Sequence, residues 1–289
     1  DRAQVDDLRA SIGSGAMAMP NPTAGQRRSD TLPGGFVRYE HDMGSALGWY
    51  AGIGHAARMP DYWELFSPNR GPAGAANAFA GVQPEHTTQL DAGLQYRRGN
   101  LEAWASAYAG RIDDYILFDY MGGGMMGSIT RARNIDADIA GGELGVDWKA
   151  REGLKLSGVL AYAWGRTDEG ALPQMPPLEG RLSASGEHAA WSWGALLRIA
   201  AAQDRVSTRQ GNVVGRDLGP SPGFAVFSIN GGYRFSDRLQ LTAGIDNLFD
   251  RAYSEHLNLA GNSAFGYPAD PERIAEPGRT GWLKLNLSY

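Results

Sequence analysis

Apolar and polar side chains alternate along many short segments of this chain. In Leu239–Asp246 every second residue is apolar, and Gln, Thr, Gly and Asp stand between them. The same alternation occurs in residues 47–54, 90–97 and 283–289. Because successive side chains of a β-strand point to opposite faces, each segment is predicted to be a strand with one apolar face and one polar or small face.

The connections between these segments are alternately tight and long. Tight connections fall at residues 41–45, 97–100, 150–153, 185–190 and 236–238, and long ones at residues 58–85, 122–130, 168–177, 204–221 and 250–277. Strands of about ten residues joined in this way are typical of a transmembrane antiparallel β-barrel with tight periplasmic turns and long outer loops. The spacing predicts about eleven strands, preceded by a partial strand at residues 1–10 and a polar loop at residues 11–33.

Two features qualify this pattern. Along residues 101–118 the alternation changes parity, which predicts a β-bulge or a long strand that leaves the membrane.

The chain also does not begin with a signal peptide, and residues 1–10 resemble the tail of a strand already under way. We therefore expect the sequence to be a fragment that lacks its N-terminal part.

Composition excludes several classes of protein. The chain is 43% hydrophobic with no apolar run of 18 residues, so no membrane-spanning helix is predicted. A net charge of −5 argues against nucleic acid as a partner, because phosphate binding requires clustered Lys and Arg. Cysteine is absent, so disulfides and thiolate metal sites are excluded. Forty glycines fit a protein of strands and turns.

Four sequence boxes resemble those of TonB-dependent outer-membrane receptors. They are GIGHAARMPDYWELF at residues 52–66, QPEHTTQLDAGLQY at 83–96, the strand at 134–148, and GIDNLFDRAY at 244–253. The boxes occur in the family's order. The resemblance implies that residues 1–289 are the C-terminal half of a barrel of about 22 strands. It also implies that a plug domain and the first barrel strands precede Asp1 in a Gram-negative outer-membrane receptor that imports a scarce solute.

The same resemblance implies partners. The TonB–ExbB–ExbD complex would supply energy through the N-terminal part, outer-membrane lipid would surround the barrel, and the barrel assembly machinery would read the terminal Tyr289. The polar positions of the strands are expected to face the lumen and to hold the plug by ion pairs. These are Asp91, Arg97, Glu143, Asp147, Arg234 and Lys284.

Methionine gives a hypothesis about the solute. Seven of the eight methionines fall in predicted outer loops or at their bases: Met17, Met19, Met59, Met121, Met125, Met126 and Met175. Thioethers are soft ligands that suit Cu(I), and imidazole suits copper generally. The loop MGGGMM carries three of them, Met121, Met125 and Met126, and His256 lies in the last long loop. Each of these side chains also has an ordinary interpretation as packing or surface.

The loop at residues 119–133, the stretch at 203–220 and the ending EPGRTGWLKLNLSY resemble those of the copper group of this receptor family. The sequence therefore predicts copper as the transported ligand, with no permanently bound cofactor. The family's principal copper ligands are expected in the plug and the other half of the barrel. A ferric-siderophore receptor is the alternative.

Two further classes of protein fit the sequence less well. An outer-membrane barrel protease would need paired carboxylates, but Asp113 and Asp114 are adjacent and so are expected on opposite faces, and no Ser, His and Asp set is in recognisable order. A soluble all-β binding module would be polar outside and apolar inside. Aromatic residues near the predicted strand ends, including Trp148, Trp164 and Trp191, favour a membrane interface instead. We expect no enzymatic activity.

Overall fold

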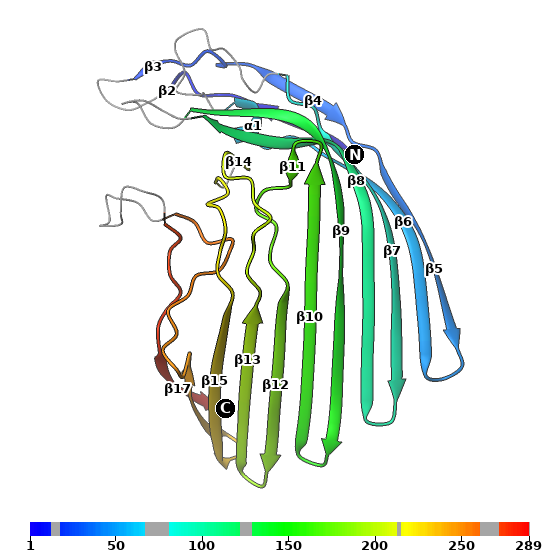
Figure 1. Cartoon of the computed structure of the whole chain (residues 1–289), viewed down its shortest axis with the longest axis vertical. Coiled ribbons are helices and arrows are strands. Elements are labelled where there is room, and N and C mark those ends of the chain that lie inside the picture. Colours follow the sequence, from blue (N-terminus) through cyan, green and yellow to red (C-terminus); the bar gives the residue numbers. More distant parts are fainter. Residues whose placement is uncertain (13–17, 67–80, 122–128, 213–214, 261–271, 289) are drawn as a thin grey trace.

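The computed structural model describes residues 1–12, 18–66, 81–121, 129–212, 215–260 and 272–288. One curved antiparallel sheet dominates it (Figure 1). Eleven strands follow one another across this sheet in chain order. They are β5 (Gly34–Met43), β6 (Leu47–Arg58), β7 (Glu85–Arg98), β8 (Leu101–Met121), β9 (Ile129–Arg151), β10 (Leu154–Thr167), β12 (Glu179–His188), β13 (Trp191–Ala200), β15 (Phe224–Ser236), β16 (Leu239–Asp246) and β17 (Thr280–Leu287). Two short strands, β11 (Gly170–Ala171) and β14 (Gln210–Gly211), pair with β10 and β8.

The predicted number of strands and the alternation of tight and long connections are confirmed. All five tight turns lie at one end of the sheet, and the long connections lie at the other, which we call the loop end (Figure 1). Gly44, Gly99 and Gly153 occupy tight turns with φ of 74°, 58° and 72°. Glycine adopts this left-handed conformation without a steric cost. Strands β5 and β17 are the two edges, and the described strands do not close the sheet.

The start of the chain differs from its prediction. Strand β1 (Arg2–Asp6) pairs with β4 (Arg27–Thr31) in a separate two-stranded sheet, and β2 (Ser11–Ile12) pairs with β3 (Met19–Pro20). Residues 11–33 are therefore not one irregular loop, as the sequence had indicated. The pairing is stabilised by isolated polar contacts around Asp7 rather than by apolar alternation, so the sequence pattern gave no sign of it.

Exposed apolar residues occupy one face of the sheet, which we call the apolar face. Leu94, Leu144 and Leu160 lie in one register row on this face and are 50%, 54% and 42% exposed. Residues with small or polar side chains alternate with them on the opposite, polar face. The apolar set is thus open to the surroundings, as a lipid-facing surface requires, and is not sealed in an interior. Small buried clusters lie toward the loop end instead, such as that of Val82, Ile116, Phe118 and Ala132.

The predicted irregularity in β8 is a β-bulge. Register shifts between Ile112 and Tyr115, and Asp114 has a φ of 61°. The Asp114 carbonyl accepts a hydrogen bond from Asn134 Nδ2 at 2.6 Å. Because strict alternation is interrupted here, the expectation that Asp113 and Asp114 point to opposite faces no longer follows from their adjacency.

The helical content is small. The described residues include the short helix α1 (Tyr62–Phe66), and no described helix has the length and apolar composition needed to span a bilayer.

Candidate functional site

Three of the receptor-like sequence boxes meet at the loop end of β6, β7 and β9. The Arg58 guanidinium contacts Glu64 at 3.0 Å and Glu85 at 2.6 Å. These two carboxylates are 4% and 12% exposed, so the cation compensates two nearly buried anions. The other Glu85 oxygen accepts the Ile116 N–H at 2.8 Å. Arg58, Glu64 and Glu85, which lie in the first two boxes, thus fix helix α1 onto the sheet.

Asn134, which opens the third box, extends the same connection. Its Oδ1 accepts the Gln83 N–H at 2.7 Å, and its Nδ2 donates to the Gln83 carbonyl at 3.0 Å. The side chain thus replaces a strand partner for the segment that enters β7. Sequence reasoning identified these boxes only as a resemblance, because their partners lie 27 to 51 residues apart.

Asp7 is the centre of a second set of buried polar contacts at the loop end. Its side chain is fully buried and accepts hydrogen bonds from Asn21, Thr23 and Tyr62 and an ion pair from Arg9 at 3.0 Å. Burial raises the pKa of the Asp7 carboxyl, but the hydrogen bonds outweigh burial and hold that pKa well below its usual range. Asp7 is therefore a structural carboxylate whose charge is compensated by Arg9 and by hydrogen bonds.

A charged cluster lies where β8 and β9 leave the sheet toward the methionine-rich loop. Arg133 binds Asp119 and Glu169, each at 2.6 Å, and Gln210 Nε2 donates to Glu169 at 3.0 Å. The hydrogen bond from Arg133 lowers the pKa of Glu169. Asp119 and Glu169 border an open hollow of about 850 Å³ together with Tyr120 and residues 206–210. Two carboxylates that share the Arg133 cation therefore border this hollow.

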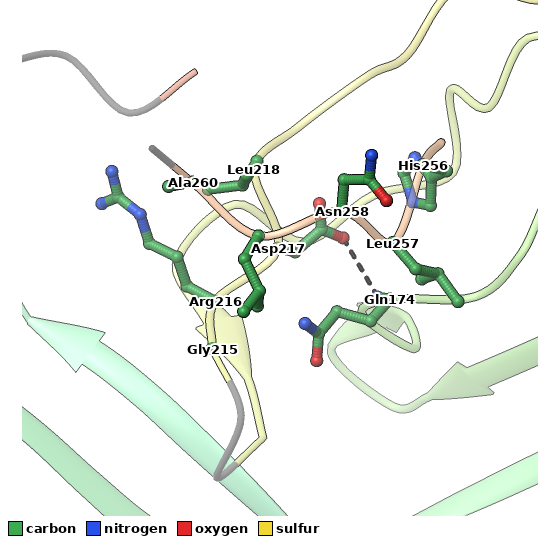
Figure 2. Close-up of a pocket in the computed structure, with 10 residues that line it drawn as sticks. Gln174, Gly215, Arg216, Asp217, Leu218, His256, Leu257, Asn258 and Ala260 are labelled. Carbon is green, nitrogen blue, oxygen red and sulfur yellow. Dashed lines mark hydrogen bonds between the residues drawn. The ribbon is translucent and has the colours of Figure 1, made fainter. Parts of the chain in front are cut away.

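A smaller pocket of about 240 Å³ lies between three long connections (Figure 2). Gln174, residues 215–218 and residues 256–260 line it. Asp217 is 2% exposed and accepts backbone N–H groups from Gln174, Ser207 and Gly219 at 2.8 to 3.3 Å. Figure 2 shows the contact with Gln174, whose buried Oε1 has no hydrogen-bond partner among the described residues. One carboxylate therefore ties the connection at residues 168–177 to the connection at residues 204–221.

His256, a predicted metal ligand, lies in the wall of this pocket. It is 6% exposed, and its Nδ1 lies 2.9 Å from Ser221 Oγ and 3.4 Å from Arg273 Nη2. Burial lowers the pKa of the imidazole, and the Arg273 guanidinium lowers it further. A neutral imidazole can bind a metal, and with Nδ1 engaged the Nε2 atom would be the donor. The ligand role of His256 stays a prediction.

The other predicted ligands are located only in part. Met121 ends β8 opposite Ile129, whereas Met125 and Met126 lie outside the described residues. Tyr289 lies outside them as well. Within the described ranges no group of three or more His, Cys, Asp or Glu side chains could hold a metal ion. The described residues therefore do not test the proposed methionine site, which stays a prediction.

The six residues predicted to face the lumen alternate with the apolar face. Asp91 follows Leu90, which is 59% exposed, and Lys284 follows Leu283, which is 70% exposed. The others are Arg97, Glu143, Asp147 and Arg234. Arg97 pairs with Glu102 at 3.2 Å and Asp147 with Lys155 at 3.2 Å, so these charges are partnered across neighbouring strands. Their contact with a plug stays a prediction.

Comparison with known proteins agrees with this architecture. The family described as TonB dependent receptor-like, beta-barrel matches residues 3–248. The chain belongs to the β-barrel of TonB-dependent outer-membrane receptors, so the alternative of a soluble module is excluded. No curated protein sequence matches this chain.

Solved structures give the relationship in more detail. The copper transporter OprC is 54% identical, with a TM-score of 0.92, over 100% of this chain and 45% of its own. The ferric enterobactin receptor PfeA from Pseudomonas aeruginosa is 21% identical, with a TM-score of 0.67, over 90% of this chain and 41% of its own. The ferric-catecholate import receptor Fiu from K12 E. coli is 16% identical, with a TM-score of 0.62, over 96% of this chain and 39% of its own. The latter two share the fold, and the chain spans less than half the length of each structure.

Proposed function

We propose that this chain is part of a receptor that captures copper outside the cell and imports it to the periplasm. The observation that carries the proposal is the 54% identity to a copper transporter along the whole chain. By comparison, the siderophore receptors are 16% and 21% identical and indicate the fold alone. The family and these structures are receptors and transporters, and we propose no catalytic activity for this chain.

The proposed ligands in this part of the receptor are Met121, Met125 and Met126, with His256 as a further candidate. A glycine-rich loop can bring its thioethers to one ion, and thioethers select the soft Cu(I) ion. The Arg133 cluster supports the strands on which this loop stands, because it ties β8 and β9 to the connection at residues 206–210. Copper would be the transported ion, and we propose no permanently bound cofactor.

The remaining parts of the mechanism are assigned to the complete receptor. A plug domain would be held by the polar face through Asp91, Arg97, Glu143, Asp147, Arg234 and Lys284. The TonB–ExbB–ExbD complex would release it, and Tyr289 would serve the assembly machinery. In this arrangement residues 1–289 form the C-terminal part of the barrel. The outer loops would deliver the ion to this lumen, where Arg97 and Asp147 are partnered on neighbouring strands.

The test uses the full-length receptor in cells that depend on it for metal supply. We expect copper to co-purify with the wild type after growth with Cu(I), and a Met121→Ala, Met125→Ala and Met126→Ala triple variant to take up copper more slowly at limiting concentration. Met43→Ala is the matched control, since Met43 is an exposed methionine at the turn end of β5. Absence of copper together with siderophore-dependent growth would reject the proposal in favour of a ferric-siderophore receptor.

A further inference from the structure

A row of one polar and three charged residues crosses the apolar face of the sheet at one level. Thr88, Arg111, Asp138 and Arg166 stand opposite one another on β7, β8, β9 and β10. Asp138 lies 3.7 Å from Arg111 Nη1 and 3.1 Å from Arg166 Nε. We call these four residues the ionic row. The copper proposal makes no use of it, because it lies on the face opposite to the lumen.

The level of the row follows from the strand register. The next row toward the turns contains Leu90 and Trp164, and Trp148 pairs with Leu156 eight residues farther down β10. Eight residues of a strand tilted by about 40° rise roughly 20 Å along the membrane normal, close to the apolar band of about 25 Å in such barrels. The two tryptophans therefore mark the two interfaces, where indole rings concentrate. The ionic row lies one step outside the outer interface, at the lipid headgroups.

The guanidinium groups at this level are held in place but accessible. Arg111 contacts Asp113 at 2.9 Å and Asp136 at 2.6 Å, and its side chain is 55% exposed. The Arg166 side chain is 61% exposed. Ion pairs this exposed contribute little in water, so a guanidinium can exchange part of its contacts at low cost. The carboxylates thus orient the cations along the sheet without saturating their five donors.

A third cation reaches the same place from a loop. Arg205 donates to the Gly165 carbonyl at 2.9 Å, and its guanidinium lies 4.9 Å from the centre of the Trp164 ring. Arg166 lies 5.7 Å from the same ring. Two guanidinium groups, those of Arg166 and Arg205, therefore lie beside one interfacial tryptophan at the level of the headgroups.

We propose that the ionic row binds the phosphate of an outer-leaflet glycolipid headgroup. Arg111 and Arg166 would donate to the phosphate oxygens, and Asp136 and Asp138 would act as positioning residues. The guanidinium fork matches phosphate in bidentate geometry, and a site beside lipid is less hydrated than open surface, which strengthens charge-assisted hydrogen bonds. The apolar face below would contact the acyl chains of the same lipid.

The experiment measures lipid retention by the full-length receptor. Wild type and an Arg111→Gln, Arg166→Gln variant are reconstituted in phosphatidylethanolamine vesicles that contain lipid A, then extracted and analysed by native mass spectrometry. We expect about tenfold weaker retention for each guanidinium removed, the effect of losing one hydrogen bond to a charged group. Arg98→Gln is the matched control, because Arg98 lies on the same face in the Trp148 row.

Two further arms make the result decisive. Dephosphorylated lipid A should be retained weakly by wild type and variant alike, and Arg111→Lys with Arg166→Lys should keep part of the retention because the charge remains. Circular dichroism, and resistance of the barrel to unfolding in detergent without heating, establish that each variant is folded. Equal retention of lipid A by a folded glutamine variant, or equal retention of the dephosphorylated lipid by wild type, would overturn the proposal.

Discussion

Asn247 and Arg251 hydrogen-bond to each other twice where β16 meets the loop end. The Asn247 side chain donates to the Arg251 carbonyl at 2.9 Å and accepts the Arg251 N–H at 2.8 Å. Its Nδ2 also lies 3.3 Å from the Pro277 carbonyl, and the residue has a φ of 50°. Asn suits this position because its short amide tolerates left-handed backbone and bonds locally. The Asn247 side chain therefore stabilises the turn that follows β16.

Replacement of Asn247 should separate the contribution of its hydrogen bonds from the cost of its left-handed backbone. Asn247→Ala removes the hydrogen bonds from a residue that is 3% exposed and keeps the backbone strain, so we expect a loss of about 2 to 4 kcal/mol. Asn247→Gly also removes the bonds but relieves the strain, and should cost about 1 to 2 kcal/mol less than alanine. Unfolding of the detergent-solubilised receptor measures the stability of the wild type and the two variants. An alanine variant as stable as the glycine variant would contradict it.

Gly145 leaves room for an aromatic ring on the polar face. A Cβ atom at Gly145 would collide with the Trp104 ring across the β8–β9 pair. We expect Gly145→Ala to destabilise the barrel by about 1 to 3 kcal/mol, as overpacking does. Gly281→Ala is the control, because nothing lies within 4 Å of its Cβ position, and it should be neutral or slightly stabilising. Equal unfolding midpoints for the two variants would show that Trp104 moves aside freely.

Arg58 should matter far more than an exposed arginine of the same sheet. Arg58→Gln leaves the carboxylates of Glu64 and Glu85 nearly buried without their cation, and we expect a loss of about 2 kcal/mol or more. Arg97→Gln breaks a pair whose side chains are 73% and 53% exposed, and should cost at most about 1 kcal/mol. Proteolysis of the connection at residues 58–85 reports the local effect. If both variants resist the protease equally, the Arg58 cluster does not hold this loop.

The sheet could be predicted from the sequence because each strand carries its own signal. Alternation around Leu144 and Leu160 depends only on near neighbours in the chain, and the family match agrees with it. The contacts at the loop end could not be predicted in this way. Arg58 and Glu85 are 27 residues apart, and Asp7 and Tyr62 are 55 apart, so only the fold brings them together. The proposed methionine ligands depend in turn on residues outside the described ranges.

The buried imidazole of His256 should make the loop end sensitive to acid. Burial and the Arg273 guanidinium place its folded pKa below the unfolded value, so the unfolded state binds more protons in mild acid. The contribution to stability is therefore present above the unfolded pKa of about 6.5 and is lost as pH falls through the lower folded pKa. Asp217 opposes this shift only as a smaller effect.

Proteolysis of the connection at residues 250–277 between about pH 8 and about pH 5 measures this contribution. We expect cleavage of the wild-type receptor to accelerate below about pH 6.5 and cleavage of His256→Gln to depend less on pH, because glutamine does not titrate. His188→Gln changes an exposed histidine at a tight turn and should behave as wild type. If wild type and His256→Gln show the same acid dependence, protonation of His256 does not open this loop, and the acid sensitivity must come from other groups.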